Sequence, residues 1–126
     1  MTLPEIFTIL KLRPGMIVPV TDYYAAAGFV EGYNAAVDDE LLHGITEWLV
    51  MKVGYGKCMA WTSLIILLFK EGKITNIRLI DPGDDHHALI EFLVRTLESF
   101  QAERDREGGA SQIIKRYEEW SKHHDE

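Results

Sequence analysis

The chain has 126 residues and a formal net charge of −7, which comes from 20 acidic and 13 basic residues. A chain of this length can bury roughly two thirds of its unfolded surface around one core, so we expect a single domain over residues 1–126 that needs no disulfide or structural metal. The acidic balance argues against nucleic-acid binding, because that function needs a basic surface to neutralise phosphates.

Cysteine content and hydropathy set the expected compartment. Cys58 is the only cysteine and cannot form an intrachain disulfide, which favours a reducing compartment. The N-terminal sequence MTLPEIFTIL lacks the basic start of a signal peptide. The longest apolar stretch, CMAWTSLIILLF, has 12 residues and is too short to cross a bilayer of about 30 Å. We therefore expect a cytoplasmic protein without a membrane segment.

The first predicted helix covers residues 3–12. Thr2 is its predicted N-cap, and Glu5 stands three residues later, which together form a capping box. Pro14 and the glycine after it end this helix.

The second predicted helix covers residues 22–37, with Thr21 as its N-cap. Gly28 and Gly32 lie four residues apart and share one face of this helix. We expect a neighbouring helix to pack closely against that face.

Two further helices are predicted in the middle of the chain. The acidic run Asp38, Asp39 and Glu40 precedes a third helix over residues 41–53, where acidic residues suit the start of a helix. A fourth helix over residues 59–69 is apolar on almost all sides and is predicted to be central.

The last third of the chain begins with an ambiguous segment. Around residues 74–80 a short strand, a helical turn and an ordered loop all fit the pattern. A fifth helix is predicted over residues 85–106, and the break at 108–109 is followed by a last helix with Ser111 as its N-cap. The predicted fold is an all-α, single-domain bundle of about six helices.

The sequence Asp84-Asp85-His86-His87 is the local cluster that most resembles a metal or acid/base site. Adjacent residues on a helix point about 100° apart, so the two histidines do not easily share one ion. The aspartates stand where an N-cap and a first-turn acid are favoured without any catalytic role. We interpret this cluster as the start of a helix.

Two other chemical motifs are rejected. Cys58 precedes a predicted helix, a position that can activate a thiol, but no local signature pairs it with a base. The sequence GYGKC at 54–58 lacks the first glycine of a phosphate-binding loop, and Cys58 replaces the serine or threonine that would hold magnesium.

Several segments together resemble one family. These are LRPGM at 12–16, GFVEGY at 28–33, HGITEWLVMKVG at 43–54, AWTSLIILLF at 60–69 and ALIEFLVRTLESF at 88–100. Their order is similar to that of small helical bacterial immunity proteins of polymorphic toxin systems, including contact-dependent growth inhibition. The resemblance covers residues 3–101. Residues 70–85 stand as an insertion relative to shorter members of that family, and residues 108–126 add a further helix.

The resemblance implies a protein that is not an enzyme, uses no cofactor or metal, and neutralises the C-terminal toxin domain by stoichiometric binding. Many such toxins are basic nucleases, and an acidic surface can occupy the groove that nucleic acid would fill. The predicted contacts to the toxin are Asp38, Asp39, Glu40 and Glu47, and secondarily Asp84 and Asp85, because acidic residues cluster near predicted helix starts.

Two alternatives remain open at this point. One is a small metal-dependent hydrolase or ligand-binding enzyme that uses the cluster Asp84 to His87. The other is a homo-oligomeric scaffold that assembles through the face of Gly28 and Gly32.

Overall fold

The computed structural model describes residues 2–17, 22–70 and 85–124. These contain six α-helices and one 3₁₀ turn: α1 Leu3–Leu12, η1 Pro14–Met16, α2 Tyr23–Ala36, α3 Ile45–Val53, α4 Trp61–Phe69, α5 His86–Glu107 and α6 Ala110–Ser121. No strand is present within the described ranges, and the predicted all-α fold is confirmed. The ambiguous segment 74–80 lies outside the described residues.

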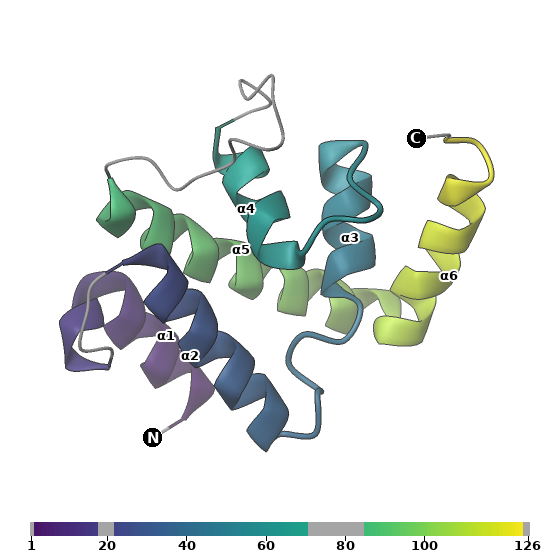
Figure 1. Cartoon of the computed structure of the whole chain (residues 1–126). Coiled ribbons are helices and arrows are strands. Elements are labelled where there is room, and N and C mark those ends of the chain that lie inside the picture. Colours follow the sequence, from purple (N-terminus) through teal and green to yellow (C-terminus); the bar gives the residue numbers. More distant parts are fainter. Residues whose placement is uncertain (1, 18–21, 71–84, 125–126) are drawn as a thin grey trace.

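Helix α5 runs along the length of the molecule and connects its parts (Figure 1). Helices α1 and α2 lie at one end, α3 and α4 near the middle, and α6 at the other end. Helix α5 contacts α1, α2, α4 and α6, whereas α3 packs mainly against α4 and α6. A single helix thus holds elements that are far apart in the sequence.

Buried side chains from all six α-helices form one hydrophobic cluster. Helix α4 is the most apolar contributor, with Trp61, Leu64, Ile65, Ile66 and Leu67 buried, which confirms its predicted central position. Burying one leucine or isoleucine side chain contributes about 1.5–3 kcal/mol. Among the described helices, none combines the length and the apolar character that a membrane span requires.

The first helix starts as the sequence predicts, whereas the fifth starts one residue later than predicted, with Asp85 as its N-cap instead of Asp84. The Thr2 hydroxyl oxygen accepts a hydrogen bond from the Glu5 backbone N–H at 3.3 Å, and the same hydroxyl donates to Glu5 Oε1 at 3.1 Å. At the start of α5, Asp85 Oδ1 accepts from the Ala88 backbone N–H at 2.9 Å. Each cap satisfies a backbone donor that has no partner inside its helix.

Two other predicted caps are corrected. Asp22 is the N-cap of α2, because its Oδ1 accepts from the Ala25 backbone N–H at 2.7 Å, while Thr21 lies outside the described residues. Ser111 is not the cap of α6, which begins one residue earlier after Gly109. Gly109 has a φ of 117°, and this left-handed turn lets the next helix begin at once.

The third and fourth helices begin later than predicted. Helix α3 starts at Ile45 rather than at residue 41, after Gly44 with a φ of 91°. The acidic run at 38–40 therefore does not stand at a helix start, and that prediction is wrong. Helix α4 starts at Trp61 because a turn precedes it, in which the Met59 backbone N–H donates to the Gly56 carbonyl oxygen at 2.9 Å.

The expected close packing at the glycines of α2 is also wrong. Gly28 and Gly32 are exposed, and a Cβ atom added at either position would meet no atom of the described residues within 4 Å. The small residues of α2 that do face the core are Ala26 and Ala27.

Candidate functional site

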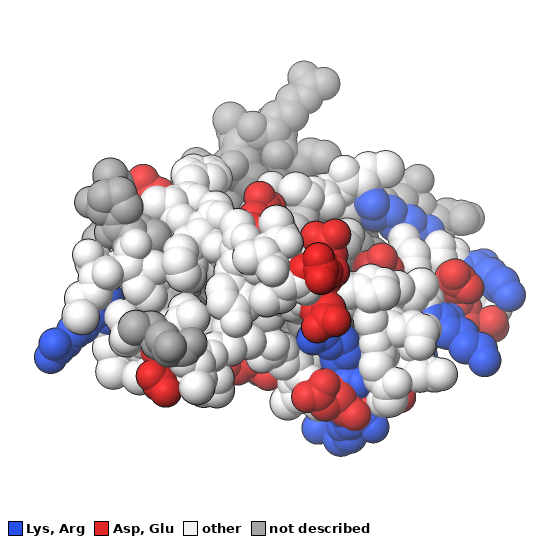
Figure 2. Space-filling model, turned by 90° about the horizontal axis from the view of Figure 1, so that it is seen from below, with Lys and Arg blue, Asp and Glu red and all other residues white. Residues whose placement is uncertain are grey.

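The candidate site is the connection between α2 and α3, residues 37–44, which we call the acidic loop. It carries Asp38, Asp39 and Glu40, and all three side chains are exposed. Acidic side chains gather near the centre of the face seen from below, where this connection lies, and basic side chains border them (Figure 2).

The backbone of the acidic loop is tightly turned. Asp38 and Asp39 have φ angles of 54° and 63°, and they are the only non-glycine residues with positive φ in the described part of the chain. The Asp39 backbone N–H donates to the Asn34 carbonyl oxygen at 2.9 Å, and that of Glu40 donates to the Val37 carbonyl oxygen at 3.1 Å. Two successive left-handed residues change the chain direction directly after α2. Aspartate tolerates this conformation better than most residues do.

Asn34, in the last turn of α2, fixes the loop from one side. Its amide nitrogen donates to Asp39 Oδ1 at 3.2 Å, and its Oδ1 accepts from the Leu42 backbone N–H at 2.8 Å. One side chain thus binds both the middle and the end of the loop. An asparagine can do this because its amide offers a donor and an acceptor together.

Arg104, near the end of α5, fixes the loop from the other side. Its Nη1 donates to the carbonyl oxygens of Glu40 at 2.7 Å, Leu41 at 3.2 Å and His43 at 3.1 Å. The guanidinium also lies 4.9 Å from the centre of the Phe100 ring. Because a cation holds three carbonyl groups of the loop, the loop has little freedom to change its shape.

Two leucines attach the loop to the core. Leu41 and Leu42 have exposed fractions of only 4% and 9%. In the loop three exposed acids are followed directly by two buried leucines, so the acids stand next to a well-packed support.

The acids of the loop are not paired with bases. Among the residues that the structure describes, no Lys, Arg or His nitrogen forms an ion pair with Asp38, Asp39 or Glu40. By contrast, Glu103 is close to both Lys52 and Arg116, at 3.9 Å from each. The loop thus keeps its negative charge available to a partner.

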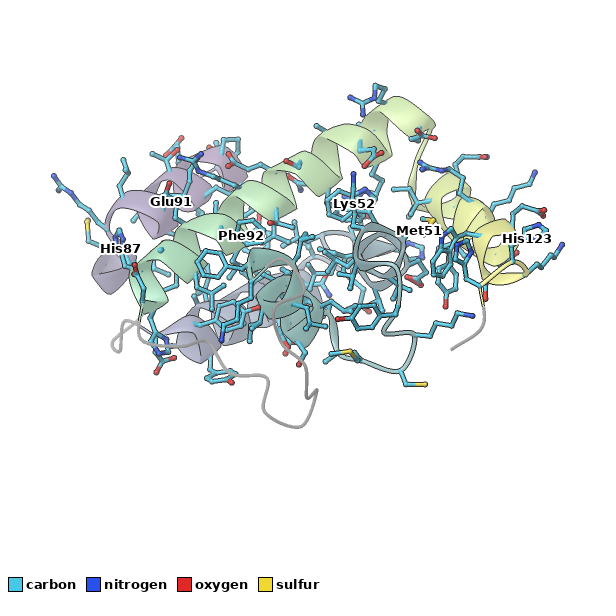
Figure 3. All side chains as sticks on the ribbon, turned by 90° about the horizontal axis from the view of Figure 1, so that it is seen from above. Met51, Lys52, His87, Glu91, Phe92 and His123 are labelled. Atoms are coloured by element: carbon cyan, nitrogen blue, oxygen red, sulfur yellow. The ribbon has the colours of Figure 1, made fainter. Side chains whose placement is uncertain are left out.

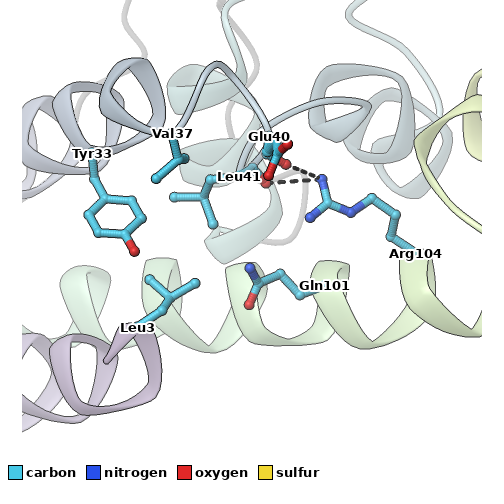
Figure 4. Close-up of a pocket in the computed structure, with 7 residues that line it drawn as sticks. All are labelled: Leu3, Tyr33, Val37, Glu40, Leu41, Gln101 and Arg104. Atoms are coloured by element: carbon cyan, nitrogen blue, oxygen red, sulfur yellow. Dashed lines mark hydrogen bonds between the residues drawn. The ribbon is translucent and has the colours of Figure 1, made fainter. Parts of the chain in front are cut away.

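A pocket of about 210 Å³ opens beside the loop (Figure 4). Its walls come from α1, α2, the loop and α5, through Leu3, Tyr33, Val37, Glu40, Leu41, Gln101 and Arg104. Val37, Glu40 and Leu41 belong both to the loop and to the wall of the pocket, so the loop and the pocket form one continuous surface.

The structure does not bring the other predicted contact residues to this loop as one cluster. Glu47 is half-buried in the first turn of α3. Asp85 caps the opposite end of α5, roughly 28 Å from Arg104 along the helix axis at about 1.5 Å per residue. Asp84 lies outside the described residues.

The histidines also lie apart. His86 Nδ1 accepts a hydrogen bond from the Tyr23 backbone N–H at 2.9 Å, so this nitrogen holds the start of α2. His87 is exposed near the start of α5, and His123 lies at the other end of the molecule (Figure 3). Within the described ranges, no group of three His, Cys, Asp or Glu side chains could hold a metal ion.

Sequence reasoning missed Asn34 and Arg104. An asparagine near the end of a helix is a weak signal for a cap, and it could have suggested a turn after α2. Nothing local to Arg104 indicates its role, because its three acceptors lie 61 to 64 positions earlier in the chain.

Comparisons of the chain with protein families, with curated proteins and with solved structures gave no match.

Proposed function

We propose that this protein is an immunity protein, which binds a cognate bacterial toxin domain and neutralises it by stoichiometric contact in the cytoplasm of the cell that makes both. The toxin domain is basic and a nuclease by class. The observation that carries the proposal is the acidic loop, a fixed segment that presents three adjacent carboxylates, none of which forms an ion pair with a described residue. The resemblance of residues 3–101 to helical immunity proteins supports the same function.

The physical basis is electrostatic complementarity with a preformed surface. A nuclease must attract the phosphates of its substrate, so its active-site groove is electropositive. An acidic surface can occupy that groove, and its field accelerates the encounter with the toxin. Because Asn34 and Arg104 already hold the loop, binding does not have to order it, which favours affinity.

The other predicted contacts are secondary in this proposal. Asp85 binds its own helix start through Ala88, and Glu47 is half-buried, so neither offers a free acidic surface comparable to the loop. We therefore assign the primary contact to Asp38, Asp39 and Glu40.

The decisive experiment is co-expression with the toxin domain encoded by the neighbouring reading frame. The proposal predicts a one-to-one complex and survival of cells that express both proteins. Absence of both the complex and the protection would refute it.

A charge-matched pair of variants tests the loop itself. The loop variant is Asp38→Asn, Asp39→Asn, Glu40→Gln. The control variant is Asp105→Asn, Glu118→Gln, Glu119→Gln, in which three exposed acids outside the loop lose the same total charge. We expect the loop variant to weaken toxin binding about 10- to 100-fold and the control to weaken it less than about threefold. Equal effects would show that only the net charge matters.

A further inference from the structure

The pocket beside the acidic loop is small, and part of its wall is apolar. At about 210 Å³ it is smaller than the roughly 300–1,000 Å³ of a typical small-molecule site, but it has room for one long side chain. Leu3, Val37 and Leu41 supply aliphatic surface along it. An aliphatic stem would bury apolar area against these side chains.

The rim of the pocket offers polar groups without partners. In Figure 4 the Tyr33 hydroxyl and the Gln101 amide point toward the space between the lining residues, with Glu40 above it. Within the described ranges, the side chains of Tyr33 and Gln101 form no hydrogen bond, and Glu40 forms no ion pair. A hydroxyl oxygen, an amide oxygen and a carboxylate are all acceptors, and an ammonium group has three donors to match them.

The local charge selects a cation over an anion. Glu40 lines the pocket, and Asp38 and Asp39 precede it in the same exposed loop. Among the described lining residues Arg104 is the only cation, and it donates to three loop carbonyl groups. Three carboxylates against one guanidinium give the loop and the pocket together a formal charge of −2, which favours a cation over an anion.

We infer that this pocket receives a lysine side chain from the partner protein, with its methylene stem over Leu3, Val37 and Leu41 and its ammonium group at Glu40. This inference rests on the proposed function for the source of the lysine, the toxin domain. The partner's lysine would bury its stem in the pocket, whereas the acidic loop by itself offers only exposed carboxylates.

The pocket can be tested without the toxin. N-acetyl-lysine N-methylamide is titrated into the protein while the methyl NMR signals of Leu3, Val37 and Leu41 are followed. The matched probes are the norleucine and glutamate analogues, which lack the ammonium group or carry the opposite charge. We expect saturable shifts with the lysine probe only. No shift with that probe, equal shifts with norleucine, or larger shifts with glutamate would each overturn the inference.

Two variants test the contribution of the carboxylate and that of the pocket volume separately. Glu40→Gln removes the carboxylate but keeps the shape, and Val37→Phe fills the pocket from the end of α2. We expect the lysine-probe shifts to weaken in the first and to disappear in the second. Glu118→Gln, an exposed acid on α6, serves as the control and should leave them unchanged.

The same variants then separate this inference from the proposed function. In the toxin complex, Glu40→Gln and Val37→Phe should each weaken binding about tenfold or more, and Glu118→Gln less than about twofold. A complex that both pocket variants leave unchanged would refute the lysine anchor and leave the immunity function standing. If no toxin complex forms, the immunity function fails, and the probe titration alone decides whether the pocket binds lysine.

Discussion

Tyr23, the first residue of α2, connects this helix to α4 and α5 by two hydrogen bonds. Its hydroxyl donates to the Thr62 carbonyl oxygen in α4 at 2.6 Å, and its backbone N–H donates to His86 in α5 at 2.9 Å. The side chain is fully buried. Burial raises the pKa of the Tyr23 phenol well above its ordinary value, with smaller contributions in the same direction from Tyr24 and Glu31. The folded state therefore keeps this phenol protonated.

The raised pKa of Tyr23 predicts alkaline destabilisation. In the unfolded chain the phenol ionises with a pKa of about 10, so its contribution to stability is fully present below that pH and is lost as the pH rises toward the folded-state pKa. Above pH 10 the slope from this group approaches about 1.4 kcal/mol per pH unit. Tyr23→Phe should reduce the free energy of unfolding by about 1 kcal/mol at neutral pH, through the lost hydrogen bond, and should flatten the alkaline decline.

Urea unfolding between pH 8 and about 11 measures this difference. Tyr55→Phe is the control, because Tyr55 is exposed, and it should keep the full alkaline decline. An equally steep decline in Tyr23→Phe would contradict the explanation.

At the scale of elements, the acidic loop depends on α5 for its shape. Arg104→Met keeps an aliphatic side chain over Phe100 but removes the donor to three carbonyl groups. We expect the free energy of unfolding to fall by about 1–3 kcal/mol. We also expect weaker toxin binding, although the variant is more acidic, because the loop is no longer held.

Arg106→Met removes the same charge from an exposed position of the same helix. It should change the free energy of unfolding by less than about 0.5 kcal/mol and should not weaken binding. Calorimetry of both variants with the toxin domain compares the two effects. If they bind equally well, the order of the loop does not contribute to affinity.

The helices could be predicted largely because their determinants are local. The caps Thr2 and Asp85 act within four residues, and the apolar periodicity of α4 and α5 is visible in the sequence. The acidic loop could not be predicted, because its shape comes from Arg104, 61 to 64 positions away, and from two aspartates in left-handed conformations. Local propensity instead favoured an earlier start of the third helix, and tertiary contacts overrode it.

The candidate site could also be predicted only where its determinants are local. Its acidic residues could be identified from their run of charge, whereas the pocket brings together α1, α2 and α5. Leu3 and Gln101 both line it although they are 98 positions apart in a chain of 126 residues. No sequence pattern places such residues together.

At the scale of the whole molecule, the net charge of −7 predicts how binding responds to salt. Long-range attraction between an acidic protein and a basic toxin accelerates their encounter and is screened over about 8–10 Å at physiological ionic strength. The association rate constant should fall about tenfold or more from low to physiological salt, while the dissociation rate constant changes little. Stopped-flow measurements over a salt series test this. A salt-independent association rate would argue against electrostatic steering.

The position of α5 along the chain also has a consequence for synthesis. Helix α1 buries Phe7 and Leu10, and its Lys11 pairs with Glu98 of α5, which lies 87 positions later. The ribosome makes the N-terminal helices first, so their apolar faces stay without their main partner until α5 has emerged. Contacts of such long range also slow the final closure. The nascent chain is therefore most prone to premature association during that interval, before its longest helix is available.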